Sequence, residues 1–166
     1  NNAGIIHNEP LIKFLEKENR IHSRESWDNV IATDLSSVFY VTSRIVDLMI
    51  QKRTKGVVIS ISSICAGGNK GQTAYSAAKA GVNALTKTWS KEIAPLGIRF
   101  ASISPGFINT SSTKNSLKES QLNNLKRIIP LQKLGDALDI AQAAELIINN
   151  QYINGSILEI DGGLVL

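Results

Sequence analysis

Three short apolar segments rich in β-branched residues limit the folds open to this chain more than any other feature. They are GVVISIS (56–62), IRFASIS (98–104) and SILEI (156–160). Glycine or proline flanks each segment, and longer stretches with helical spacing of apolar residues separate them. Buried strands that alternate with helices are typical of an α/β protein with a parallel sheet covered on both faces. The 166 residues are enough for one such domain, spanning 1–166.

Helices are expected in the stretches around these strands. Ser23 is the predicted N-cap of a long helix that continues to about Met49. A second helix is predicted from Gln72 to Ile93, and a third from about Ala137 to Asn149. The charged segment 11–22 lacks firm periodicity, so we expect a loop that holds at most a short helix.

Composition and charge exclude several classes of function. The formal charge of +4 is modest, and the short basic run at 51–55 is interpreted as a solvated helix end, so no nucleic-acid partner is expected. The single cysteine, Cys65, excludes an intrachain disulfide and fits a reducing, cytoplasmic compartment. His7 and His22 lack metal-ligand spacing and are expected at the surface, so no metal site is predicted. No apolar run approaches a membrane span, so no membrane partner is expected.

The segment ISSICAGGNKGQTAYSAAKAG (61–81) carries the candidate chemistry. Tyr75 and Lys79 are four residues apart in a predicted helix and therefore share one face. A nearby ammonium favours phenolate and lowers the pKa of a tyrosine from its usual value of about 10. A serine at the carboxyl end of a parallel strand lies where open α/β sheets bind ligands. Together these groups suit proton exchange with a carbonyl or alcohol oxygen during hydride transfer from a cofactor.

Further motifs accompany this pair in a fixed order along the chain. They are NNAG (1–4), the serine pair that ends the first buried strand, PGFINT (105–110) and NGSILEIDGG (154–163). Over essentially the whole chain, the set resembles the short-chain dehydrogenase/reductase family, most closely its 3-oxoacyl-(acyl-carrier-protein) reductase-like members. The resemblance implies a Rossmann-type doubly wound parallel sheet, of which this chain is the C-terminal portion only. The first strands and the glycine-rich phosphate loop are expected upstream of Asn1, and AGGNKG (66–71) does not match G-x-G-x-x-G.

The resemblance also implies a role for individual residues. Tyr75 matches the proton donor and acceptor, and Lys79 matches the lysine that lowers the tyrosine pKa and binds the nicotinamide ribose. The polar segment 109–124 matches a mobile substrate-binding loop. The cofactor is NADP or NAD, since the part of the fold that reads the ribose 2′ position is absent from this sequence. The remaining matches line the cofactor: Asn2, Ala3, Gly4, Pro105, Gly106, Ile108 and Thr110.

Two positions of the match are ambiguous or depart from the family pattern. Counting from the start of the strand makes Ser63 the catalytic serine, whereas counting back from Tyr75 makes it Ser62. We choose Ser63, because a strand end is a firmer anchor than a loop. The family usually has asparagine in the long helix, where it helps to hold a proton-relay water beside the lysine, but Asp34 stands there in this chain. An ionised carboxylate accepts hydrogen bonds and does not donate them.

The function implied is NAD(P)-dependent reduction of a ketone, with a 3-oxoacyl thioester favoured, or oxidation of the matching secondary alcohol. A homotetramer or homodimer built on the two long helices is implied as well, and the small and apolar residues along 74–93 permit such packing. Two alternatives stay open. The chain is a truncated, non-catalytic fragment or interaction module, or it belongs to an epimerase or dehydratase on the same scaffold.

Overall fold

A parallel three-stranded sheet forms the centre of the molecule in the computed structural model, which describes residues 1–110, 113 and 119–166. Its strands lie in the order β1 (Gly56–Ile61), β2 (Ile98–Pro105) and β3 (Ser156–Ile160). Gly56 pairs with Ile98, and Ala101 pairs with Ser156. The parallel α/β sheet predicted from the three apolar segments is confirmed.

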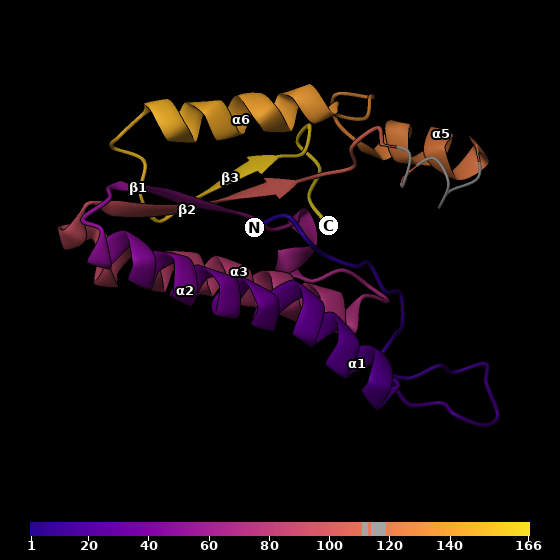
Figure 1. The fold of residues 1–166 in the computed structure, drawn as a ribbon. Coiled ribbons are helices and arrows are strands. Elements are labelled where there is room, and N and C mark those ends of the chain that lie inside the picture. The colour runs from indigo at the N-terminus through magenta and orange to yellow at the C-terminus, as the bar shows by residue number, and fades with distance from the viewer. Residues whose placement is uncertain (111–112, 114–118) are drawn as a thin grey trace.

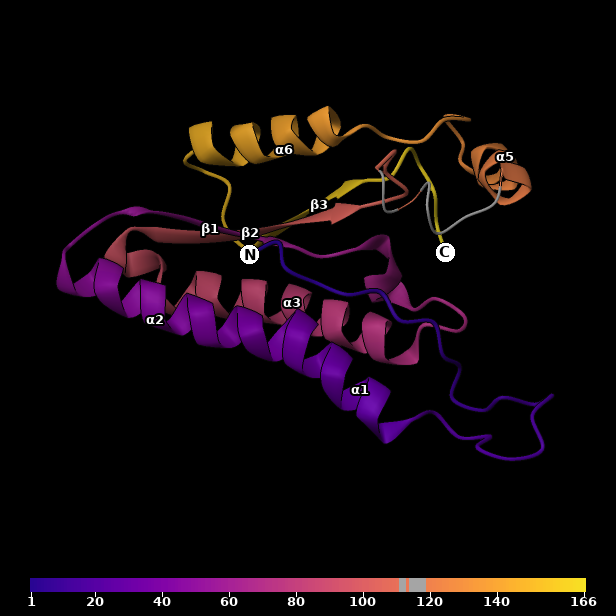
Figure 2. The same cartoon turned by 45° about the vertical axis from the view of Figure 1, so that its right-hand side comes forward.

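Helices cover both faces of the sheet (Figures 1 and 2). On one face lies α6 (Ala137–Asn149), and on the other lie α1 (Arg24–Ile31), α2 (Ser37–Gln51) and α3 (Thr73–Glu92). The elements that complete the described chain are the π-helical turn η1 (Ala32–Ser36), the 3-10 turns η2 (Ile64–Gly67) and η3 (Ala94–Leu96), and α5 (Glu119–Ile128).

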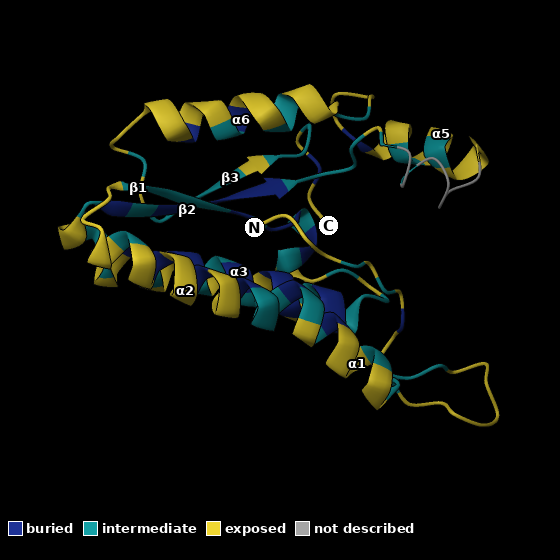
Figure 3. Cartoon of the chain, in the orientation of Figure 1, coloured by how far each residue is buried: buried dark blue, intermediate teal, exposed yellow. Residues whose placement is uncertain are grey.

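The alternation of side chains along β2 creates a core on each face. Phe100 packs with Val46 of α2 and Trp89 of α3, whereas Ile103 packs with Ala143 and Ile147 of α6. Successive side chains of a strand point to opposite faces, so a central strand buried on both sides is mostly apolar, and the buried polar side chains of β2 are the small serines Ser102 and Ser104. Figure 3 shows the resulting burial along β2 and along the inner side of α3. The core therefore holds β1, β2 and α3 in a fixed relation.

The chain enters the fold beside β1 and then crosses toward the helices. The N–H of Ile61 donates to the Asn1 carbonyl, and the backbone nitrogen of Asn1 donates to the Ile59 carbonyl, both at 2.9 Å. Ser23 accepts a hydrogen bond from the N–H of Ser26 at 3.2 Å, which confirms it as the N-cap of the first helix. The predicted long helix forms as α1, η1 and α2 in succession.

The segment 11–22 is a hairpin-like excursion that projects beyond α1, as Figure 1 shows. The N–H of Lys13 donates to the Arg20 carbonyl at 2.7 Å, and the N–H of His22 donates to the Leu11 carbonyl at 3.0 Å. These bonds occupy the backbone groups that a helix would need, so the short helix allowed for this loop does not form.

The helix α5 lies in a region where a loop was expected, so that expectation is wrong from Glu119 onward. The reason is that Leu122, Leu125 and Ile129 recur at helical spacing, with Ile129 only 1% exposed. Residues 111–112 and 114–118 of the same predicted substrate-binding loop lie outside the described residues.

Candidate active site

The two serines that follow β1 have different partners. The Ser62 hydroxyl donates to the backbone carbonyl of Lys79 at 3.3 Å. The Ser63 hydroxyl accepts the N–H of Cys65 at 3.2 Å, and it lies close enough to Tyr75 to lower the pKa of that phenol. This geometry favours Ser63 over Ser62 as the serine that acts with the tyrosine, and the assignment stays a prediction.

Tyr75 and Lys79 lie on the buried face of α3, as their spacing predicted. Tyr75 is 8% exposed and Lys79 is 5% exposed. The Lys79 ammonium lies 5.5 Å from the centroid of the Tyr75 ring and donates to the Ile61 carbonyl at 3.1 Å. The end of β1 therefore positions the lysine, and the helix positions the tyrosine above it.

Asp34 approaches the same site from the π-helical turn. Its side chain is fully buried, and Oδ1 accepts the N–H of Ile5 at 2.8 Å. The other oxygen, Oδ2, lies 3.4 Å from the Lys79 ammonium, and no hydrogen-bond partner for it is present among the described residues. A Cβ on Gly4 would lie 3.1 Å from Oδ2, so glycine lets the chain pass closely over this carboxylate. π-Helical turns are frequent at functional sites.

The pKa of Tyr75 is shifted in the direction opposite to the one expected. Burial raises the pKa of Tyr75 to about 12, the nearby Cys65 and the Asp34 carboxylate add to the rise, and the hydrogen bond with Ser63 opposes it. The expected lowering by Lys79 is therefore wrong for this structure. The physical reason is that the phenolate would be desolvated and would lie close to a second negative charge.

One cavity brings most of the predicted residues together. It has a volume of about 220 Å³, and Ser62, Ser63, Tyr75, Pro105, Gly106 and Ile108 all line it. Its apolar lining includes Ile6, Ile64 and Phe107. Lys79 and Asp34 are not in its wall and lie behind Tyr75. Tyr75 and Ser63 therefore present a proton donor and a hydrogen-bonding hydroxyl to whatever occupies this space.

Several cofactor-lining residues expected from the resemblance do not reach this cavity. Asn2 and Ala3 are exposed on the first segment of the chain, which starts beside β1. The Thr110 hydroxyl forms a hydrogen bond with the Thr113 hydroxyl at 3.1 Å. The motif search missed Asn69 and Gln72, which line the cavity and hydrogen-bond to each other at 2.9 Å. Asn69 and Gln72 could have been predicted as cavity residues, because they are polar and lie in the sequence between the serine pair and Tyr75.

The turn after β2 is held by a close approach to β3. The N–H of Gly106 donates to the Ile160 carbonyl at 2.9 Å. A Cβ on Gly106 would lie 2.7 Å from the Cα of Asp161, closer than packed atoms come. Only glycine fits here without a backbone shift, and the Pro105–Gly106 wall of the cavity depends on this contact.

The residues present fit the nicotinamide end of the implied cofactor. A lysine ammonium has three N–H donors. In the described part of the chain, one donor of Lys79 binds the Ile61 carbonyl, and Asp34 lies within ion-pair distance of another. A third donor is left for a ribose hydroxyl, next to a cavity rimmed by Pro105, Gly106 and Ile108.

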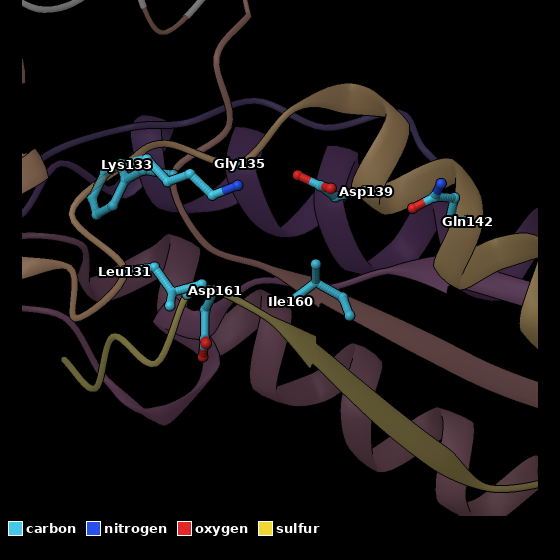
Figure 4. Close-up of a pocket in the computed structure, with 9 residues that line it drawn as sticks. Leu131, Lys133, Gly135, Asp139, Gln142, Ile160 and Asp161 are labelled. Atoms are coloured by element: carbon cyan, nitrogen blue, oxygen red, sulfur yellow. The ribbon is translucent and has the colours of Figure 1, made fainter.

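A second cavity lies on the α6 side of Phe107 and has a volume of about 310 Å³. Figure 4 shows Lys133 and Asp139 extending toward each other across it. The carboxylates have structural tasks, because Asp139 accepts the N–H of Asp136 at 2.7 Å and Asp161 accepts the N–H of Gly163 at 2.8 Å. The cavity beside Tyr75 is therefore the stronger candidate for an active site.

His22 is buried, contrary to its expected surface position. Its side chain is 8% exposed and packs at right angles to the Trp27 ring, with Nδ1 at 3.3 Å from Glu9. His7 also contacts Glu9, at 3.1 Å.

Within the described ranges, no group of three or more His, Cys, Asp or Glu residues is arranged to hold a metal ion.

Among the described residues, no helix combines the length and the apolar character that crossing a membrane requires.

Known proteins with a similar sequence are oxidoreductases by name, which agrees with the chemistry that the site geometry suggests. Residues 1–165 match the family model described as enoyl-(acyl carrier protein) reductase. The chain is 39% identical over 169 residues to the 3-oxoacyl-(acyl-carrier-protein) reductase FabG of Thermotoga maritima, covering 100% of this chain and 65% of that protein. It is 40% identical over 167 residues to the FabG of Chlamydia muridarum, covering 99% of this chain and 63% of the relative.

A mammalian relative has a similar sequence identity to this chain. The (3R)-3-hydroxyacyl-CoA dehydrogenase of Canis lupus familiaris is 36% identical over 167 residues, with 99% of this chain and 61% of that protein covered. The chain thus spans less than two thirds of the length of each of these curated relatives.

Proposed function

The chain belongs to the short-chain dehydrogenase/reductase family, and from this we propose that it carries the catalytic residues of an oxidoreductase dependent on NADP or NAD. The reaction is reduction of a ketone to a secondary alcohol, or the reverse. The observation that carries the proposal is that Ser63 and Tyr75 line the same cavity, with the Lys79 ammonium 5.5 Å from the tyrosine ring. A positioned phenol and hydroxyl are what a carbonyl oxygen needs as it gains a proton.

Each residue has a separate task in this reaction. The nicotinamide dinucleotide, when bound, supplies or accepts the hydride. The Tyr75 hydroxyl gives its proton to the substrate oxygen during reduction and takes it back during oxidation. The Ser63 hydroxyl donates a hydrogen bond to the same oxygen and orients it. Lys79 would hold a cofactor hydroxyl with its third donor, and it supports the end of β1 through the Ile61 carbonyl.

The proposed substrate class is a 3-oxoacyl or 3-hydroxyacyl thioester. The names of the relatives share this chemistry, since they include 3-oxoacyl-(acyl-carrier-protein) reductases and (3R)-3-hydroxyacyl-CoA dehydrogenases. The cavity supports it, because Ile6, Ile64 and Phe107 offer an apolar wall for an acyl chain next to the polar pair.

The proposed assembly is a homodimer or homotetramer built on α2 and α3. An open groove of about 430 Å³ lies between these helices and is lined by Leu35, Phe39, Tyr40 and Leu85, among others. Phe39 is 48% exposed and Tyr40 is 66% exposed. Contiguous exposed apolar side chains of this kind mark association surfaces in soluble proteins. Analytical ultracentrifugation tests this, and a monomer at all concentrations contradicts it.

Turnover of a 3-oxoacyl thioester by the full-length protein tests the proposed function. NADPH and NADH are supplied in parallel, and consumption of the reduced nicotinamide is followed by absorbance. Formation of the 3-hydroxyacyl product with either cofactor is the expected result. Cofactor binding without any hydroxyacyl product would instead support a non-catalytic role, and loss of water or inversion of the alcohol would support a dehydratase or an epimerase.

A further inference from the structure

The Asp34–Lys79 pair is a buried arrangement of opposite charges behind the reacting tyrosine. The two side chains are 0% and 7% exposed, and the carboxylate oxygen lies 3.4 Å from the ammonium nitrogen. An isolated buried charge is strongly unfavourable, whereas a closely paired one is tolerated. The opposite charge of each residue therefore makes the burial of the other charge tolerable.

The two oxygens of Asp34 have separate partners. Oδ1 accepts the N–H of Ile5 at 2.8 Å and so ties the segment above the site to the π-helical turn. Oδ2 has no hydrogen bond in the described part of the chain and faces Lys79. A neutral amide in this place would keep the first bond but would not carry the negative charge. The charge of Asp34 is thus separable from its anchoring role.

Within the described part of the chain, three ionisable groups lie near Tyr75, so the charge of Asp34 matters there. They are Lys79 on the same helix, Asp34 on the π-helical turn and Cys65 on η2. Lys79 favours the phenolate, whereas a carboxylate in contact with that lysine opposes the effect. The raised pKa of Tyr75, with burial as the largest cause and Asp34 among the others, agrees with this balance.

We propose that Asp34 is a positioning residue that offsets the charge of Lys79 and thereby keeps the Tyr75 hydroxyl protonated far above neutral pH. The proposal rests on the proposed function, because it concerns the same proton transfer. In the reduction direction the hydroxyl must hold its proton, so activity persists into the alkaline range. In the oxidation direction the hydroxyl must lose its proton, so activity rises toward alkaline pH.

Replacement of Asp34 by asparagine isolates the charge. Asp34→Asn keeps the size of the side chain and the acceptor for the Ile5 N–H. In the variant, the alkaline limb of the kcat/KM profile for reduction moves to lower pH by on the order of one unit, the smaller end of the effect of a neighbouring charge. The rising limb for oxidation moves by the same amount. Asp28→Asn, an exposed aspartate on α1, is the matched control and leaves both limbs in place.

A titration without substrate decides the inference independently of turnover. Phenol ionisation is followed by ultraviolet absorbance, and the spectrum of a Tyr75→Phe variant is subtracted in each background so that only Tyr75 contributes. Tyr75 ionises at lower pH in Asp34→Asn than in the parent. Far-UV circular dichroism over the same pH range restricts the comparison to folded protein. Identical Tyr75 titrations in the two folded proteins overturn the proposal.

A second variant keeps the test decisive if Asp34→Asn does not fold. Lys79→Met removes the ammonium that favours the phenolate and leaves the Asp34 carboxylate unopposed, so Tyr75 ionises at higher pH than in the parent. An unchanged titration in this variant also overturns the proposal. Absence of turnover in the parent protein would count against the proposed oxidoreductase and would leave the titrations to decide the role of Asp34.

Discussion

The Lys79 ammonium lies 5.5 Å from the centre of the Tyr75 ring, one helical turn further along α3. Both side chains are buried, and Ser63 from the neighbouring strand end completes the arrangement by lining the same cavity as the tyrosine. A fixed phenol between a lysine and a serine is positioned for proton transfer, and its removal is the most direct test of the proposed chemistry.

Tyr75→Phe removes the hydroxyl and keeps the ring in its place. Because the proposed proton donor is lost, turnover of a 3-oxoacyl thioester falls by at least about a hundredfold. Cofactor binding, measured by titration calorimetry, changes little. Tyr152→Phe serves as the control, since Tyr152 is 99% exposed and lies far along the chain from the site. Near-parental turnover in Tyr75→Phe would show that this tyrosine is structural.

The serine pair allows a test in which neighbouring residues are compared. Ser63→Ala removes the hydroxyl that lines the cavity beside Tyr75, so kcat falls by at least about tenfold while the fold is retained. Ser62→Ala removes a buried hydrogen bond to the Lys79 carbonyl, and its effect is a loss of stability of about 1 kcal/mol with a smaller change in kcat. Steady-state kinetics and urea denaturation separate the two effects. The reverse ranking of the kcat values would assign the catalytic role to Ser62.

Gly106→Ala introduces a methyl group where no space exists. The new Cβ would lie 2.7 Å from the Cα of Asp161, so the turn after β2 has to move away from β3. We expect a loss of about 1–3 kcal/mol in the free energy of unfolding, as is typical of overpacking, together with a rise in KM. Gly67→Ala is the control, because nothing lies within 4 Å of its added Cβ. Equal stability of the two variants would contradict this account of the turn.

The lowered pKa of Glu9 makes the free energy of unfolding depend on pH in the acid range. Burial raises the pKa of Glu9, but hydrogen bonds from His7 and Lys13 outweigh it, and the pKa falls from 4.5 to about 2. A carboxyl whose pKa is lower in the folded state stabilises the fold above the unfolded value. This contribution is therefore complete above pH 4.5 and is lost as the pH falls from 4.5 to about 2.

Glu9→Gln removes this contribution at all pH values. The urea midpoint of the variant is lower than that of the parent at neutral pH, and the two midpoints converge as the pH approaches 2. Glu18→Gln, an exposed position on the same hairpin-like excursion, is the control and keeps the parental pH dependence. Parallel curves for Glu9→Gln and the parent would mean that the carboxylate adds no pH-dependent stability.

Local sequence patterns were sufficient for the strands, for the helices around them and for the Tyr75–Lys79 face, but α5 was missed. β-Branched runs such as 56–62 predict buried strands because their side chains pack well on a pleated surface. The spacing of four residues places Tyr75 above Lys79 in any α-helix, whatever the rest of the fold does. The capping role of Ser23 is similarly local, since its partner is only three residues away.

Contacts between remote segments decided the rest of the candidate site. The meeting of Ser63 and Tyr75 in one cavity depends on how β1 docks against α3, and the Asp34–Lys79 ion pair joins residues from two helical elements. The direction of the Tyr75 pKa follows from these contacts, so helical spacing alone gave the wrong sign. Burial, desolvation and ion-pair distance are properties of packed surfaces, and they take definite values only once distant parts of the chain are brought together.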